Sequence, residues 1–134
     1  MSEVLQKKFQ KLIRELGRLI RAEVDEGLPA KKAKAKPRAD VSPWTSAFVD
    51  ARWFADAEGF TSKLRVVLPN RKLHGSLRVT SDMKALLDKV WKVRKEDSAA
   101  EWYGLKVTVS PDGAVTTELN TDPNCVVDPT WFHS

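Results

Sequence analysis

The chain has 134 residues, of which 42% are hydrophobic and 31% are charged, and its formal net charge is +5. This length fits one domain without room for a second core, and the composition is globular rather than disordered or membrane-spanning. One cysteine, Cys125, excludes an intramolecular disulfide framework and a zinc site built from several cysteines. We therefore expect a single cytoplasmic domain, residues 1–134, without a signal peptide or a spanning helix.

The positive charge is concentrated near the N-terminus. Residues 31–38 (KKAKAKPR) supply five positive charges, whereas residues 99–134 contain one basic and five acidic residues. Residues 28–43 include three prolines and few large apolar side chains, so burial cannot offset the entropy lost on ordering them. The sequence predicts a basic linker over 28–43 between an N-terminal segment, 1–27, and a core and tail, 44–134.

The first predicted element is a helix over residues 3–26, where apolar residues recur at spacings of three and four. From residue 44 the periodicity changes to two, which predicts strands over 46–57, 60–68 and 73–79. A second helix over 82–95 follows, with Thr80 or Ser81 as its N-cap. Strands over 102–109 and 114–120 flank the turn 110–113 and form a hairpin, and residues 121–134 are a tail.

The predicted order is therefore α-β-β-β-α-β-β. Consecutive hairpins with two helices indicate an α+β fold, an antiparallel sheet of about five strands with both helices packed on it.

Residues able to support catalysis are scarce. The histidines and the cysteine are His74, His133 and Cys125, too few for the usual metal sites or for a nucleophile with its base. No glycine-rich phosphate-binding motif occurs. Asp122 and Asp128 precede prolines, where aspartate more often forms turns than acid–base pairs. We predict no catalytic site, no metal and no cofactor, and hence no enzyme.

The tryptophans fall into two groups. Trp53, Trp91 and Trp102 lie within predicted strands or a helical apolar stripe and are expected in the core. Trp44 and Trp131 lie at segment ends close to prolines, and they are the candidates for anchoring a partner, with a role as lids on the sheet as the alternative.

The C-terminal third resembles a known family. In the segment WYGLKVTVSPDGAVTTELNTDPN, residues 102–124, a Trp opens a strand, a Pro-Asp-Gly turn follows, and the outgoing strand runs into Asp-Pro-Asn, with Trp131 and Phe132 soon after. This arrangement is similar to the closing hairpin of YezG-type immunity proteins, which are encoded beside bacterial polymorphic toxins. Thr121 stands where the family usually has Tyr, so a role of that tyrosine is not carried over.

The resemblance implies an immunity protein, or antitoxin, that binds and neutralises a cognate toxin domain in the cytoplasm. The residues expected to contact the toxin are Glu118, Asp122, Asp128 and Trp131. The alternative is a nucleic-acid-associated module that uses the basic residues of 7–38. An enzyme or ligand carrier is a third possibility that no residue pattern promotes, and a homodimer through helix 3–26 stays open.

Overall fold

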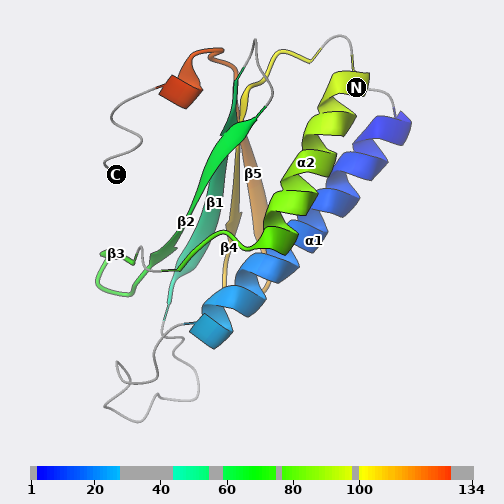
Figure 1. Ribbon diagram of the computed structural model, residues 1–134. Helices are drawn as coiled ribbons and strands as arrows, with labels where there is room; N and C mark the ends of the chain where they lie inside the picture. Colours follow the sequence, from blue (N-terminus) through cyan, green and yellow to red (C-terminus); the bar gives the residue numbers. More distant parts are fainter. Residues whose placement is uncertain (1–2, 28–43, 55–58, 75–76, 98–99, 128–134) are drawn as a thin grey trace.

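The computed structural model describes residues 3–27, 44–54, 59–74, 77–97 and 100–127. An antiparallel sheet forms one layer, and two helices form a second layer on one of its faces (Figure 1). Helix α1 spans Glu3–Gly27 and helix α2 spans Ser81–Glu96. The predicted α+β class, with two helices and an antiparallel sheet, is confirmed.

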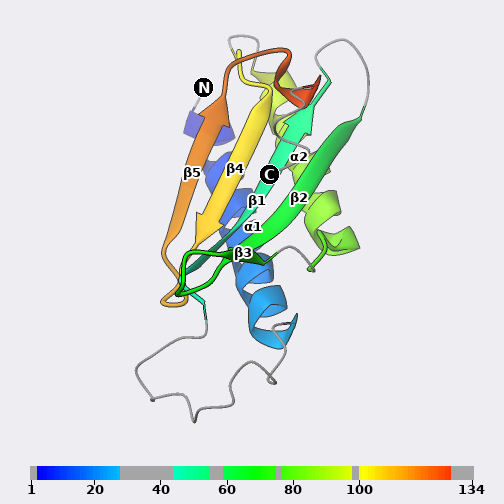
Figure 2. The same ribbon diagram turned by 90° about the vertical axis from the view of Figure 1, so that its left-hand side faces the viewer.

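The sheet has four long strands and one very short one. Its strand order is β3-β2-β1-β4-β5, and every neighbouring pair is antiparallel (Figure 2). The bounds are β1 Ser46–Trp53, β2 Phe60–Val67, β3 Leu73–His74, β4 Gly104–Val109 and β5 Val115–Asn120.

The prediction of a third long strand over 73–79 is wrong. Strand β3 contains two residues, which pair with Val66 and Val67 at one end of β2. Leu77 and Val79 are instead partly buried against the hydrophobic core, and the Thr80 side chain caps α2. The Leu77 side chain lies beside Gly27 at the end of α1, and Val79 borders a hollow with Lys84 and Asp88 of α2, so both pack near the helices rather than continuing the strand ladder. With long strands alone, the order is α-β-β-α-β-β.

The second helix agrees with its predicted signals. The Thr80 hydroxyl accepts a hydrogen bond from the Met83 backbone N–H at 3.2 Å, which satisfies one of the unpaired donors of the first turn. Asp82 lies in the first turn and Arg94 and Lys95 in the last, where their charges complement the helix dipole. Helix α1 also agrees with the prediction to within one residue at its C-terminus.

Strand boundaries are less well predicted. Strand β1 ends at Trp53, earlier than the predicted residue 57, and residues 55–58 lie outside the described part of the chain. Strand β4 begins at Gly104, two residues later than expected. The hairpin at 110–113 is confirmed: Gly113 has φ +94°, and its N–H bonds to the Ser110 carbonyl at 3.0 Å. This positive φ is the reason that the turn needs glycine at position 113.

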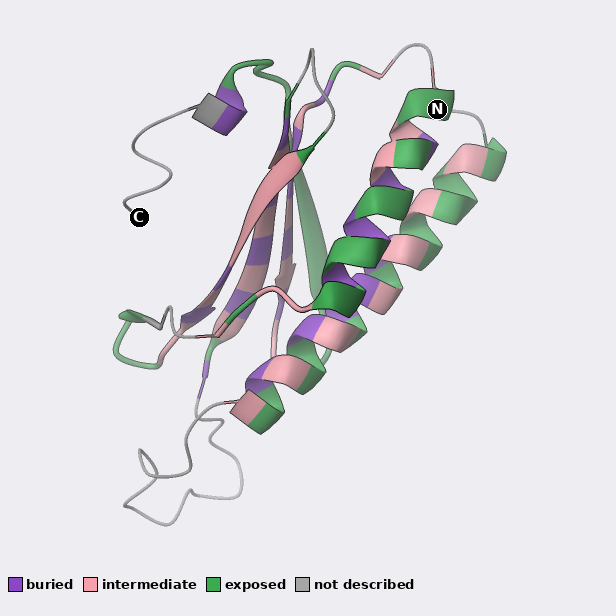
Figure 3. Ribbon diagram, in the orientation of Figure 1, coloured by how far each residue is buried: buried purple, intermediate pink, exposed green. Residues whose placement is uncertain are grey.

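The core lies between the helices and the sheet. Every second residue of β1, ending at Trp53, is buried on the helix side, and the buried stripes of α1 and α2 face them (Figure 3). At one end Trp53 stacks on Trp91 with ring centroids 5.0 Å apart, and Trp102 meets both edge-on. Trp53 and Trp102 are therefore core residues as predicted, and Trp91 packs against the same core while half-buried.

The end of α1 is tied to the start of β1. The Trp44 indole N–H donates to the Asp25 carboxylate at 3.0 Å, and Trp44 is 1% exposed. The chain therefore leaves α1 and enters β1 at neighbouring points. The predicted linker 28–43 lies outside the described residues. Among the helices that are described, none is long and apolar enough to cross a bilayer.

Removing a buried side chain under α2 tests this arrangement. Leu87 is fully buried, so we expect Leu87→Ala to lower the free energy of unfolding by about 2–5 kcal/mol through lost burial and the cavity left behind. Val4 is 65% exposed, and Val4→Ala should change stability by less than about 0.5 kcal/mol. Urea denaturation followed by tryptophan fluorescence measures both, and equal effects would contradict the packing described.

Candidate functional site

The face of the sheet turned away from the helices carries the largest concentration of charged side chains that the register brings together. The half-buried residues of β1 lie on this face, and their cross-strand partners on β2, β4 and β5 share it. We call it the open face. Its main side chains are Phe48, Asp50, Arg52, Lys63, Arg65, Lys106 and Glu118. Both helices lie behind it (Figure 2).

One row of the open face alternates in charge across four strands. Lys63 of β2 is opposite Asp50 of β1, Asp50 is opposite Lys106 of β4, and Lys106 is opposite Glu118 of β5. Oppositely charged residues directly across strands stabilise an antiparallel sheet by about 0.2–1 kcal/mol per pair. The register therefore sets the order of the charges along the row.

Asp50 is the electrostatic centre of this row. In addition to its two cross-strand lysines, Asp50 forms an ion pair with Arg52 at 3.5 Å. The two side chains are only 15% and 14% exposed, respectively. A carboxylate among three cations in a partly desolvated place is fixed in position, so Asp50 organises the cations more than it offers itself to a partner.

An aromatic ring lies beside this row. The Lys106 ammonium is 4.4 Å from the centre of the Phe48 ring, a cation–π contact worth about 0.5–1 kcal/mol at an exposed site. Arg65 is opposite Phe48 on β2. Phe and Arg are both enriched in protein–protein interfaces, so Phe48 and Arg65 favour a protein partner for this part of the face.

The cations of the open face raise the electrostatic potential felt by Lys63. Desolvation lowers the pKa of Lys63 below its ordinary value, and the neighbouring charges of Arg65, Arg52 and Lys106 lower it further, whereas Asp50 opposes the shift. The open face as a whole has more positive than negative groups, with four cations and two carboxylates in the set defined above.

The chain after β5 folds back onto one end of the open face. A short 3-10 turn, Cys125–Val127, follows β5, and Arg52 donates a hydrogen bond from Nη1 to the Cys125 carbonyl at 2.6 Å. Cys125 is buried and unpaired, and desolvation raises the pKa of its thiol. Arg52 thus joins the charged row to the C-terminal turn.

A shallow hollow of about 410 Å³ lies beside this turn, between β1, β4 and β5. Its lining includes Asp50, Arg52, Lys106, Glu118 and Asn120. The hollow is lined mainly by polar atoms, so it suits a charged or hydrogen-bonding side chain of a partner.

The residues predicted to bind a partner are not all brought together. Glu118 lies on the open face, at the end of the charged row. Asp122 lies at the turn after β5, where its carboxylate accepts a hydrogen bond from the Asn124 backbone N–H at 2.9 Å, which is the turn-forming role considered for it. Asp128 and Trp131 lie outside the described residues.

Other residues singled out from the sequence are used within the fold. Trp44 is buried and hydrogen-bonded, as described above, and the thiol of Cys125 is enclosed. The apolar stripe of α1 that suggested a homodimer through 3–26 is buried inside the chain at Ile13, Leu16, Ile20 and Val24. The side chains of His74 and His133 are outside the described part of the structure.

A second surface lies on the outer side of the helix pair. Leu12 of α1 and Leu86 and Val93 of α2 form the floor of a groove of about 710 Å³. Its rim is mostly cationic and contains Lys8, Lys11, Arg14, Arg18, Lys89 and Lys92, with Glu15 as the acidic member. Glu15 bonds to Arg18 on the same helix.

Comparison with protein-family models and with curated proteins finds no match to this chain. Within the described residues, no group of three or more His, Cys, Asp or Glu side chains is placed to hold a metal ion.

The contact between Arg52 and the C-terminal turn can be tested through the thiol of Cys125. Since that thiol is buried and its pKa is raised, we expect its alkylation at about pH 8 to be at least about tenfold slower than in the urea-unfolded chain. Arg52→Gln should accelerate labelling of the native protein. The Arg52 charge itself lowers the Cys125 pKa, but desolvation is the larger influence, so opening the turn dominates.

The control for this experiment is Arg65→Gln, which removes a cation from the same face at a residue whose guanidinium donates to the Leu64 carbonyl at 2.9 Å. Its labelling rate, followed by mass spectrometry, should equal that of the unchanged chain. If Arg52→Gln also leaves the rate unchanged, Arg52 does not hold the turn.

Proposed function

We propose that this chain is an immunity protein that binds a cognate bacterial toxin domain through the open face of its sheet. The observation that carries the proposal is the row Lys63–Asp50–Lys106–Glu118, which presents ordered charges of both signs across four strands. A mixed pattern of this kind selects a protein partner with complementary charges and disfavours others.

The sign pattern favours protein over nucleic acid as the partner of this face. A surface that binds a phosphate backbone gains affinity from every cation it presents, whereas carboxylates on it are repelled. Here Asp50 and Glu118 are interleaved with the cations rather than placed at the margin. A toxin surface that also mixes acidic and basic side chains can pair with both signs.

The resemblance to YezG-type immunity proteins supports the same reading. Residues 102–124, which carry most of it, contain β4 and β5 and supply Lys106, Glu118 and much of the border of the hollow. Glu118 is the last member of the charged row, Asp122 lies in the turn after β5, and Asp128 and Trp131 follow in the chain. We propose that these residues extend the docking surface.

Charge reversal on the open face tests the proposal with the protein encoded beside this chain as the partner. Lys106→Glu places a negative charge opposite Asp50 and Glu118. It also brings a negative charge against the acidic side chain that we expect the partner to place at this position. We expect it to weaken the complex at least about tenfold, equivalent to about 1.4 kcal/mol, and to abolish protection from toxicity on co-expression. Calorimetry or surface plasmon resonance measures the affinity.

Lys92→Glu is the matched control, because Lys92 is an exposed lysine on the outer side of α2. It should change the affinity by less than about twofold. Circular dichroism of both variants checks that the fold is kept. If the unchanged chain forms no complex and gives no protection, the immunity function is wrong; if Lys92→Glu weakens the complex and Lys106→Glu does not, the docking face is wrong.

The cationic rim of the helix groove favours a second candidate, a nucleic-acid-associated module. Cations of α1 from Lys8 to Arg18 meet Lys89 and Lys92 of α2 around this groove, and the basic residues 31–38 follow α1 in the chain. Counterion release predicts that affinity falls by nearly one log unit per log unit of salt for each phosphate neutralised.

Fluorescence anisotropy with labelled single-stranded and duplex DNA or RNA at about 50 mM salt checks this candidate. Binding that is lost in Lys89→Glu and kept in Lys106→Glu would support it. Undetectable binding of every probe would exclude it.

A further inference from the structure

Strand β5 is an exposed edge of the sheet. It is paired with β4 on one side, and no other strand of the described residues lies along its outer side (Figure 2). Five of its six residues are exposed, including the apolar Val115 and Leu119 at 36% and 46% (Figure 3). The opposite edge differs, since β3 pairs with one end of β2, and the segment Leu77–Val79 lines a hollow with β2.

The backbone N–H and C=O groups of β5 point alternately toward β4 and toward the outer side of the strand. The Ala114 and Asn120 carbonyls accept hydrogen bonds from Ser110 and Tyr103, so the even-numbered positions are directed at β4. In an antiparallel pair the bonded positions alternate, which directs the N–H and C=O groups of Val115, Thr117 and Leu119 outward. An unpaired row of this kind is a template for another strand.

The sequence of β5 is complementary to itself in one register. When two copies meet antiparallel about a two-fold axis at Thr117, Val115 of each copy is opposite Leu119 of the other. The three positions whose backbone groups point outward, Val115, Thr117 and Leu119, then all form hydrogen-bonded pairs between the two copies. On the other side of the sheet, Glu118 is opposite the second copy's Thr116. Moving the axis to residue 118 would place the two Glu118 carboxylates opposite each other, which is unfavourable.

We propose that two copies of this chain associate through their β5 edges in this register and form one continuous antiparallel sheet. The two-fold axis is perpendicular to the sheet, so all four helices lie on the same side. The exposed Val115 and Leu119 of both copies are then covered on that side. The interface is isologous, as in most homodimers.

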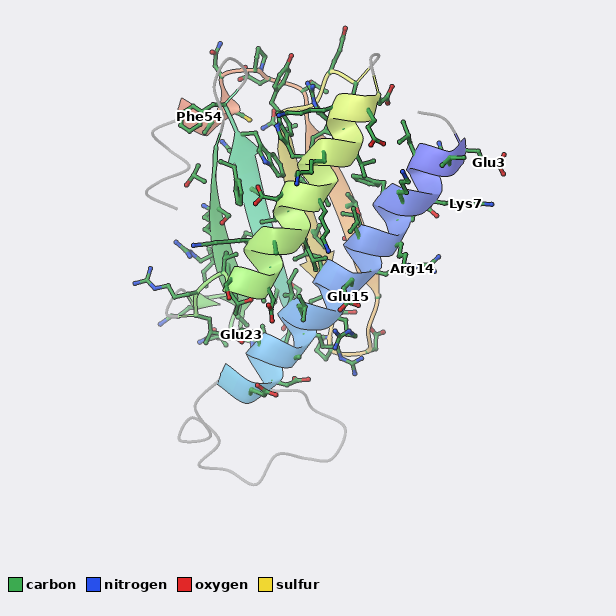
Figure 4. All side chains as sticks on the ribbon, turned by 45° about the vertical axis from the view of Figure 1, so that its right-hand side comes forward. Glu3, Lys7, Arg14, Glu15, Glu23 and Phe54 are labelled. Atoms are coloured by element: carbon green, nitrogen blue, oxygen red, sulfur yellow. The ribbon has the colours of Figure 1, made fainter. Side chains whose placement is uncertain are left out.

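The charge of α1 gives this association a salt dependence that is opposite to that of phosphate binding. On the side of α1 turned away from α2, Lys7 and Arg14 lie with the acidic Glu3 (Figure 4), and Arg14 also borders the helix groove; α1 contacts β5. In the dimer these cations face those of the second copy across the axis. Screening weakens their repulsion, so dimerisation should strengthen as salt is raised from about 50 mM to 500 mM.

Sedimentation equilibrium of the full chain over a range of protein concentrations measures the association. We expect a monomer–dimer equilibrium with no larger species, because an isologous contact uses the β5 edge of both copies. Thr117→Pro removes an outward N–H that β4 does not use, and proline is tolerated at such edge positions. It should abolish the dimer while the monomer stays folded.

Leu119→Lys is a second variant that does not depend on proline being accommodated. It introduces two cations at the interface for each dimer and should raise the dimer dissociation constant at least about tenfold. Leu73→Lys, at an exposed apolar position on β3 at the opposite edge of the sheet, is the matched control and should leave the constant within about twofold.

Cross-linking distinguishes this register from other modes of association. Thr117→Cys places two thiols on the two-fold axis, with Cα atoms about 5.5 Å apart in a bonded pair, within disulfide range. Mild oxidation should give a covalent dimer. Thr116→Cys, which is opposite Glu118 rather than itself, should not cross-link. A chain that is monomeric at all concentrations and salts, or cross-links equally at both positions, would overturn the proposal.

Discussion

The packing of α1 and α2 on a single face of the sheet determines what each strand presents. In β1, the central strand, every second residue is buried under the helices, and the residues between them lie on the open face. The burial of apolar side chains that stabilises the fold is therefore concentrated on the helix side of the sheet. There Trp53, Trp91 and Trp102 pack against one another at one end of the core. The other side carries charged residues, among which Asp50 and Arg52 form an ion pair and are themselves largely covered.

Local signals in the sequence were sufficient for the helices and the hairpin. Thr80 with Asp82 marked the start of α2, and Ser110–Gly113 has the residues that a tight turn requires. The third strand was predicted wrongly because Leu77 and Val79 alternate as strand residues do, while in the fold both are partly buried against the core, with Leu77 beside the end of α1. Periodicity indicates which side chains are buried, but it does not indicate which element of the fold they pack against.

The open face was only partly predictable for a related reason. The alternation in β1 identifies Asp50 and Arg52 as a polar side of the strand, and Glu118 was selected for its place in the acidic C-terminal third. The row that includes them depends on β4 lying beside β1, a pairing between residues more than 50 positions apart. No local pattern specifies which strands are neighbours, so Lys63 and Lys106 become members of one surface only when the register is known.

The two proposed interfaces use different parts of strand β5, and this makes them compatible. Edge pairing is made by the backbone of β5 and by Val115 and Leu119 on the helix side, whereas docking to the open face uses side chains such as Glu118 on the opposite side. A dimer would place two charged rows in one continuous sheet and leave both accessible. A toxin that instead added its own strand to β5 would compete with the second copy. A complex formed by strand addition would therefore contain one copy of this chain, whereas a complex formed through the open face would contain two.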